Sequence, residues 1–424
     1  MTNIIGNEIA FKTFSYLKVN ETEIKIPEIK GKSYKEAGEK NPNEISEFEN
    51  IKYGISNEVL ELNRKYLNYY NLYKTSLEEE KEDFKLLELD DNYNELFDLH
   101  DIIAEKDSKI KVIIDYTSYG ENNKFRNSVI RVLAKENSEV ELFIITRDDN
   151  RSLVLESIGV YTEDGAKVAV HQYELGASKL YTNYKCELIG ENSSSIVDSI
   201  YFGKEDEYLN MNYDMIHRGE KTESDILVNG ALKDNSSKNF KSNLQFIEGA
   251  KGAVGAEEEY SILLDDTVHS VSVPLMLAHE DDVVGNHASS AGKLDMDQIF
   301  YLMSRGISLE EAESLIVESK FSRAIDSLNN EELIEEVWNS VRKIIKRGNW
   351  NVYKDRNWRD KKRVSLFRIK TKWEKYCLFW QWSNNSKTSW NYGKHKKLLW
   401  KRKWKSSQRC TLSSNEVNRS LWKF

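Results

Sequence analysis

A single histidine among small and acidic residues is the best candidate for chemistry in this sequence. His287 follows Asn286 and precedes Ala-Ser-Ser, and the acidic pair Asp281 and Asp282 lies five to six residues before it. A neutral imidazole is a borderline ligand that can hold iron, and carboxylates are hard oxygen donors. His287 is therefore a candidate metal ligand. The alternative is a histidine that hydrogen-bonds a turn and caps the fold, beside carboxylates that are simply solvated.

Motifs for other kinds of chemistry are not found in the chain. The three cysteines, Cys186, Cys377 and Cys410, form no CxxC pair, so they predict neither a disulfide framework nor a self-contained metal site. Residues 249–259, GAKGAVGAEEE, are glycine-rich but lack the Lys-Ser/Thr of a phosphate-binding loop. The few, unpaired cysteines fit a reducing, cytoplasmic location.

The net charge of −9 is the sum of an acidic segment and a basic segment. Residues 349–424 carry 21 Lys and Arg against 4 Asp and Glu, which leaves 40 basic and 66 acidic residues in 1–348. The strongly acidic body argues against nucleic acid as its partner. No run of about eighteen apolar residues occurs, so no membrane span is expected.

The sequence pattern of the elements that must position His287 changes along the chain, from one typical of helices to one typical of strands. Residues 43–83 are rich in Glu, Lys, Leu, Asn and Tyr and are typical of helices, so we expect a helical region over 1–100. From Lys109 onward, short β-branched and aromatic runs alternate with turn residues for about 170 residues. A sandwich or barrel fits this pattern, but a β-solenoid core over 101–292 fits the spacing better.

Residues 293–347 return to a helical period. Asp295 is a candidate N-cap, and Ser308 with Glu311 forms a capping box for a second helix before a third over about 330–347. Such short amphipathic helices cannot bury their apolar faces alone, so they must dock on the solenoid or hold a partner. The first of these helices and its C-terminal end carry the residues that could bind a partner: Phe300, Tyr301, Leu302, Met303, Ser304, Arg305 and Gly306.

Residues 281–321, DDVVGNHASSAGKLDMDQIFYLMSRGISLEEAESLIVESKF, closely resemble the signature of the SufB/SufD family. The matching features are an acidic pair with Val, the His, Gly-x-Leu-Asp, and Phe-Tyr-Leu-x-Ser-Arg-Gly-Ile. The stretch Thr13–Ile24 also resembles the family's N-terminal pattern. Many members have Ser-His-Gly-Ala-Thr where this chain has Asn-His-Ala-Ser-Ser, which leaves the local geometry open.

The resemblance implies a right-handed parallel β-helix flanked by helical segments. It implies that the C-terminal helices, with Phe300 to Gly306, dock SufC, an ABC-type ATPase, and that the β-helix pairs with a SufB-type paralogue. The turn with Asp281, Asp282 and Asn286 would face that partner. A transient iron–sulfur cluster would form at the interface near His287, with sulfur supplied indirectly by a cysteine desulfurase. The short body and the shortage of cysteines favour the SufD type over the SufB type. The resemblance then implies a scaffold with no catalytic residues and no stably bound cofactor of its own.

Two other interpretations fit a β-solenoid with C-terminal helices. β-Solenoids also include carbohydrate-active enzymes, but no pair of carboxylates can be singled out at glycosidase spacing. A free-standing structural solenoid is the third possibility, against which the apolar C-terminal helices argue.

The basic, Trp-rich segment 348–424 shows no lasting helical or strand period. Reading it one base out of frame, with AT-rich codons, turns residues 372–389 into a string that resembles the start of a SufS-type cysteine desulfurase. We therefore interpret it as an out-of-frame, disordered tail, which the nucleotide sequence of the locus would test.

Overall fold

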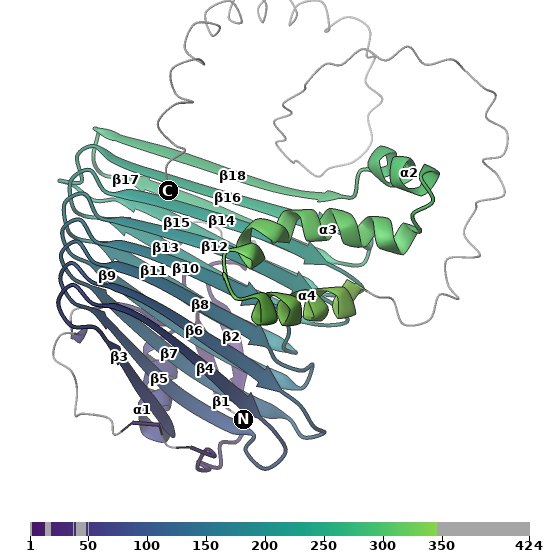
Figure 1. The fold of residues 1–424 in the computed structure, drawn as a ribbon, viewed down its shortest axis with the longest axis horizontal. Coiled ribbons are helices and arrows are strands. Elements are labelled where there is room, and N and C mark those ends of the chain that lie inside the picture. The colour runs from purple at the N-terminus through teal and green to yellow at the C-terminus, as the bar shows by residue number, and fades with distance from the viewer. Residues whose placement is uncertain (1, 13–17, 37, 40–47, 50, 346–424) are drawn as a thin grey trace, which may run out of the picture. The chain divides into compact units, whose positions relative to one another are not determined.

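The computed structural model describes residues 2–12, 18–36, 38–39, 48–49 and 51–345. The predicted tail over 348–424 falls outside these residues, so both its disorder and its reading frame stay predictions. Along the described part of the chain, sixteen consecutive strands build a parallel β-solenoid, followed by three helices (Figure 1). The all-β solenoid core with C-terminal helices is thereby confirmed.

The strands alternate between two eight-stranded parallel sheets, so each solenoid turn contributes one strand to each. Residues paired across neighbouring turns lie from 26 (Leu153 and Lys179) to 32 (Ser237 and His269) positions apart. One sheet holds β3 Tyr69–Lys74, β5 Glu95–Ala104, β7 Lys124–Ala134, β9 Ser152–Thr162, β11 Lys179–Leu188, β13 Tyr208–His217, β15 Ser237–Phe246 and β17 His269–Ala278. The other holds β4 Glu80–Leu89, β6 Lys109–Ser118, β8 Glu139–Arg147, β10 Lys167–Glu174, β12 Ser194–Gly203, β14 Glu223–Leu232, β16 Ala253–Leu263 and β18 Val283–Lys293.

One corner of the solenoid repeats the same backbone device turn after turn. At this corner a residue adopts a left-handed conformation, with φ between 53° and 71°, just before each even-numbered strand from β6 to β16. Its amide donates to a carbonyl of the next turn, as in Asn137 N to Asp164 O (2.8 Å) and Gly165 N to Glu191 O (2.9 Å). Asn, Asp and Gly tolerate this conformation best, which explains the turn residues seen in the sequence. Glu78 has the same conformation just before β4, so the full series is Glu78, Asp107, Asn137, Gly165, Asn192, Lys221 and Gly252.

The interior between the two sheets is mostly aliphatic and aromatic, but it also contains a buried ionic cluster. Arg126 on β7 is fully buried, and its guanidinium lies 3.3 Å from Asp148 and 3.0 Å from Glu156. It also donates to Thr146 Oγ1 (2.9 Å) and covers the ring of Tyr116. A charge removed from water in this way is tolerated because every arm of the guanidinium has a partner.

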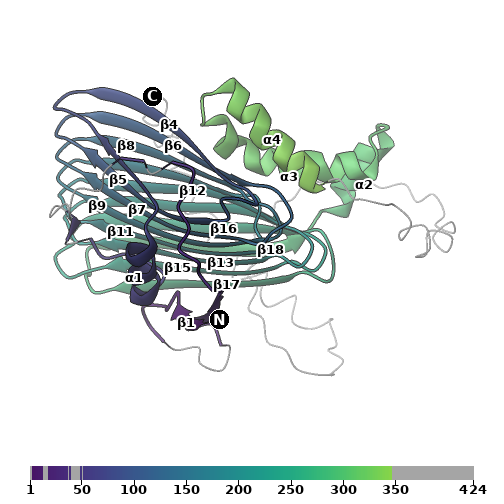
Figure 2. The ribbon, with the colours of Figure 1, turned by 90° about the horizontal axis from the view of Figure 1, so that it is seen from below.

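Each outer face of the solenoid is covered by a different segment of the chain (Figure 2). The odd-numbered sheet is covered by the antiparallel pair β1 Thr2–Gly6 and β2 Thr22–Ile26 and by α1 Asn57–Tyr66. The even-numbered sheet is covered by α3 Leu309–Asp326 and α4 Glu331–Ile345. Two lysines tie these helices to the solenoid. Lys111 of β6 donates to Leu328 O just after α3 (2.8 Å), and Lys233, just after β14, donates to Ile344 O at the end of α4 (3.2 Å).

The caps predicted for the C-terminal helices are confirmed. Asp295 Oδ1 accepts from the amide of Asp297 (2.9 Å) at the start of α2 Met296–Ser304. Ser308 and Glu311 form a reciprocal capping box at the start of α3.

The helical region expected over residues 1–100 is wrong for much of its length. Within the described part of 43–83, only residues 57–66 are helical, and strands begin at Tyr69. The strand β4, EKEDFKLLEL, has the composition of a helix. Nevertheless, it pairs along its whole length with β6, because pairing and burial at its second half outweigh local propensity. The solenoid therefore starts about 30 residues earlier than expected.

Glu207, in the turn between β12 and β13, gives the fold a pH dependence that can be measured. It is 3% exposed, and burial raises the pKa of its carboxyl to about 8. The folded protein therefore keeps a proton there that the unfolded chain loses above about pH 4.5, so stability falls as pH rises towards 8. We expect Glu207→Gln to remove on the order of 1 kcal/mol of this loss per pH unit, measured by urea denaturation at pH 5 to 8.

Glu220→Gln is the matched control, since Glu220 is an exposed turn residue of the next solenoid turn. Parallel stability–pH curves for the wild type and Glu207→Gln would contradict the prediction.

Candidate functional site at the open end of the solenoid

The last solenoid turn consists of β17 and β18, each at the end of its sheet. Within the described residues no further strand pairs with either of them, so side chains that point inward from β18 face an open end (Figure 1). The predicted site residues 281–306 lie on this turn and on the helix that follows it.

His287 lies on the strand β18 and not in a turn, which corrects the expected local structure. It pairs in register with Glu257 of β16, so the two side chains point to the same side, into the solenoid. Because no turn covers β18, the His287 side chain is 49% exposed, whereas that of Glu257 is 4% exposed. His287 Nδ1 lies 4.0 Å from Glu257 Oε1.

The other three residues expected beside His287 are not gathered around it. Asp281 and Asp282 lie in the exposed turn between β17 and β18, where the carbonyl of Asp282 accepts from Gly252 N (2.7 Å). Asn286 belongs to β18 and, one residue before His287, points to the opposite face of the sheet. The four residues therefore do not form one turn. Asp281 and Asp282 lie in the turn before β18, whereas Asn286 and His287 lie on the strand, which begins at Val283.

Beneath His287, a buried cluster holds a second glutamate in place. Glu259 of β16 forms an ion pair with Lys238 of β15, and both are almost fully buried. Hydroxyl groups surround the same carboxylate: Tyr201 (3.2 Å), Ser261 (3.0 Å) and, from β18, Ser289 (3.1 Å). All the hydrogen-bonding capacity of Glu259 is engaged within the protein.

Tyr201 reaches Glu259 across an intervening solenoid turn. It starts on β12, and the strand between, β14, has Gly230 at the position paired with it. A Cβ atom at Gly230 would lie about 1.9 Å from the Tyr201 ring, so only glycine leaves room for the ring to pass. This contact connects the interior of the solenoid to its last turn.

The carboxyl group of Glu257, unlike that of Glu259, is not engaged by an ion pair and a set of hydroxyl groups. No hydrogen bond of normal geometry to either of its carboxyl oxygens is found among the described residues. Burial raises the pKa of Glu257 to about 8, although the nearby hydroxyl of Ser242 favours the charged form and lowers this pKa in part. Across the described part of the chain, no group of three or more His, Cys, Asp or Glu side chains is placed to hold a metal ion.

The helix α2 exposes most of the apolar residues predicted to bind a partner. Met296, Phe300 and Tyr301 are 68%, 68% and 57% exposed, and only Ile299 of this helix is buried. Arg305 places its guanidinium 5.2 Å from the centre of the Tyr301 ring. Met303, Ser304 and Gly306 are also exposed, and Leu302 is half-buried. Docking on the solenoid thus covers α3 and α4 but leaves this face of α2 free within the described residues.

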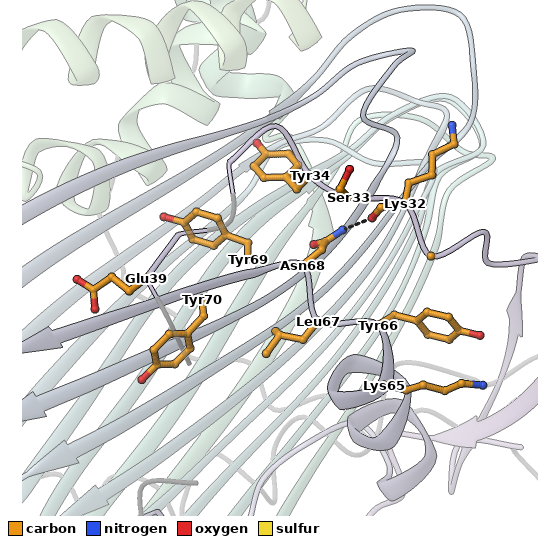
Figure 3. Close-up of a pocket in the computed structure, with 11 residues that line it drawn as sticks. Lys32, Ser33, Tyr34, Glu39, Lys65, Tyr66, Leu67, Asn68, Tyr69 and Tyr70 are labelled. Atoms are coloured by element: carbon orange, nitrogen blue, oxygen red, sulfur yellow. Dashed lines mark hydrogen bonds between the residues drawn. The ribbon is translucent and has the colours of Figure 1, made fainter. Parts of the chain in front are cut away.

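A pocket of about 490 Å³ lies at the first turn of the solenoid, near α1 (Figure 3). Its walls include Tyr34, Tyr69 and Tyr70, and Asn68 Nδ2 donates to Lys32 O across it (3.0 Å). None of the predicted site residues lines it.

The residues that sequence reasoning missed are Glu257, Glu259, Lys238 and Tyr201. The signal that could have revealed Glu257 is the solenoid period, since it lies 30 residues before His287. Using that signal requires the register of the turns, which only the structure provides.

The family model described as SUF system FeS cluster assembly, SufBD core domain, matches residues 88–320, more than half of the chain. The chain belongs to the SufBD core family. This match includes His287, the cluster beneath it and all of α2.

Curated proteins of the SufBD family are similar over shorter stretches. The chain is 30% identical over 159 residues to the iron–sulfur cluster assembly protein SufD of Bacillus subtilis, covering 38% of this chain and 36% of that protein. It is 26% identical over 218 residues to a SufBD family protein of Staphylococcus epidermidis, covering 51% and 47%. A SufBD family protein of Mycobacterium tuberculosis is 25% identical over 197 residues, covering 46% and 23%. The alignments thus span less than half the length of these relatives.

Proposed function

We propose that this SufBD family protein is a SufD-type scaffold subunit for iron–sulfur cluster assembly. In this proposal it pairs with a SufB-type paralogue, docks a SufC-type ATPase and has no catalytic activity of its own. The observation that carries the proposal is the place of the family signature. Its histidine stays exposed on the last turn and its Phe-Tyr pair on the helix that follows, while most of the solenoid is packed.

In this proposal the ATPase binds to the exposed face of α2. Large aromatic and methionine side chains are the residues that anchor protein interfaces, and single proteins rarely leave several of them exposed on one short helix. Phe300, Tyr301 and Met296 supply such anchors, and Arg305 adds a cation at the end of the helix.

In this proposal the paralogue binds at the end strands of the solenoid. The outer edge of β18 carries backbone donors and acceptors that a strand from a second protein can pair with. His287 faces this end, so a partner bound there would close over it. The nascent cluster is cargo at this interface, with sulfur supplied indirectly by a cysteine desulfurase.

The cysteine content favours the SufD-type role. Cys186 is fully buried in the core, and burial raises the pKa of its thiol to about 12, so it stays protonated and unreactive. Cys186 is the cysteine of the described residues, so in this proposal thiolate ligands for a cluster come from the paralogue.

No helix within the described residues is long and apolar enough to cross a bilayer. The acidic body, with 66 Asp and Glu against 40 Lys and Arg over 1–348, repels nucleic acid. A cytoplasmic location completes the proposal.

The proposal is tested by co-expressing the full chain with the SufC-type and SufB-type subunits of its source and measuring the mass, iron and sulfide of what co-purifies. We expect a complex of all three. His287→Ala should leave the complex intact and lower the iron and sulfide recovered after reconstitution, because the site loses its imidazole. Retention of neither partner by a folded chain would refute the scaffold role, and unchanged iron and sulfide would refute the role of His287.

A further inference from the structure

Glu257 is an unusual group for a protein interior. Its residue exposure is 3%, and its two carboxyl oxygens have no hydrogen-bond partner among the described residues. A buried carboxyl without partners has lost its hydration without compensation, a cost that a serine or valine there would avoid. A carboxyl group in this position is a candidate for binding a ligand.

The contrast with Glu259 shows which carboxylate is available. Both side chains point inward from the same strand, two residues apart. Glu259 is engaged by Lys238, Tyr201, Ser261 and Ser289, so its charge and its oxygens are already matched. Glu257 has none of these partners and faces His287.

The space around Glu257 limits where a ligand can lie. On the interior side, a cavity of about 10 Å³ is bordered by Glu257, Ser242, Ser272 and Ser289, which is the volume for about one water molecule. On the other side lies His287, half exposed at the open end. Since this cavity is too small for a larger group, a ligand shared by Glu257 and His287 would lie on the side of the exposed imidazole.

We propose that Glu257 and His287 together form a two-ligand site for a first-row divalent cation of the Fe²⁺ class, with its remaining positions open at the end of the solenoid. One carboxylate and one imidazole suit such a cation. Two ligands at about 2.1 Å from a metal and in adjacent positions lie about 3.0–3.4 Å apart. The observed 4.0 Å between His287 Nδ1 and Glu257 Oε1 closes to that range by a small rotation of the exposed imidazole.

This inference deepens the proposed function, since it names the group that holds the iron beside His287. The site has too few ligands to be complete in this chain. A partner at the open end would supply the others, so the isolated chain should bind the metal weakly and reversibly.

The test is a titration of the isolated full-length chain with Co²⁺, followed by calorimetry and by visible absorption. Glu257→Gln and His287→Ala should each weaken the binding at least about 10-fold, and the double variant should be no weaker than the weaker single variant, because one site is lost in all three. Glu257→Gln keeps the shape of the side chain and removes a buried acid, so it should fold.

Glu258→Gln is the matched control. Glu258 lies next to Glu257 on the same strand but is exposed on the outer face, where it accepts from Tyr260. It should change Co²⁺ affinity less than about 2-fold. Wild-type affinity in Glu257→Gln, or additive losses in the double variant, would overturn the proposal. Because no partner is present, this result is independent of whether the three-subunit complex forms.

Discussion

Replacing Arg126 with alanine is expected to lower the free energy of unfolding by about 3–5 kcal/mol, the largest stability effect that we anticipate in this protein. The guanidinium is fully buried between the sheets and is held by Asp148, Glu156 and Thr146 from three neighbouring strands or turns. Its removal leaves the carboxylates of Asp148 and Glu156 without a counter-charge. Urea denaturation followed by circular dichroism measures the loss.

Arg151→Ala provides the control for the loss of a positive charge. Arg151 is an exposed turn residue whose guanidinium donates to the carbonyl of Gly120, and its replacement should cost less than about 1 kcal/mol. Equal destabilisation by the two substitutions would show that the buried cluster contributes nothing special to the fold.

Replacing Phe300 with aspartate should weaken the binding of the SufC-type ATPase at least about 30-fold, while the fold of the chain is unchanged. Phe300 is 68% exposed on α2, so aspartate removes no packing within the described residues. An aromatic anchor at the centre of an interface contributes 2 kcal/mol or more, and a charge in its place must also be desolvated. Calorimetric titration of the purified ATPase into the full chain measures the affinity.

The N-terminal segment offers a matched control for this experiment. Phe11 is 55% exposed and belongs to the segment that precedes the solenoid, so Phe11→Asp should leave the affinity within about 2-fold of the wild type. An unchanged affinity in Phe300→Asp would place the ATPase on another surface.

Much of the architecture follows from local patterns in the sequence. Caps such as Asp295 and Ser308 act within one helical turn, so their residues predict them directly. The alternation of short strands and turn residues predicted an all-β core, but a sandwich or barrel fitted it too, and only the spacing favoured the solenoid. The first strands were missed because β4 has many Lys and Glu residues, whose stability as a strand comes from the turns next to it.

The candidate site was less predictable, and the reason is distance along the chain. His287 was found because it belongs to a local motif, whereas its neighbour Glu257 lies 30 residues earlier in a run of three glutamates. Nothing in that run distinguishes the inward Glu257 and Glu259 from the outward Glu258. Only the register between β16 and β18 does so.

The free edge of β18 also bears on how this chain avoids aggregation before it meets a partner. Gly285, Ala288, Ser289, Ser290, Ala291 and Gly292 give the strand small side chains, which contribute little to contacts between strands. Edge-to-edge pairing of two copies would rest on backbone hydrogen bonds alone, without an apolar zipper to make it permanent. The edge of β18 can therefore pair with a complementary strand, but its small side chains give it too little apolar surface to drive growth into fibres by itself.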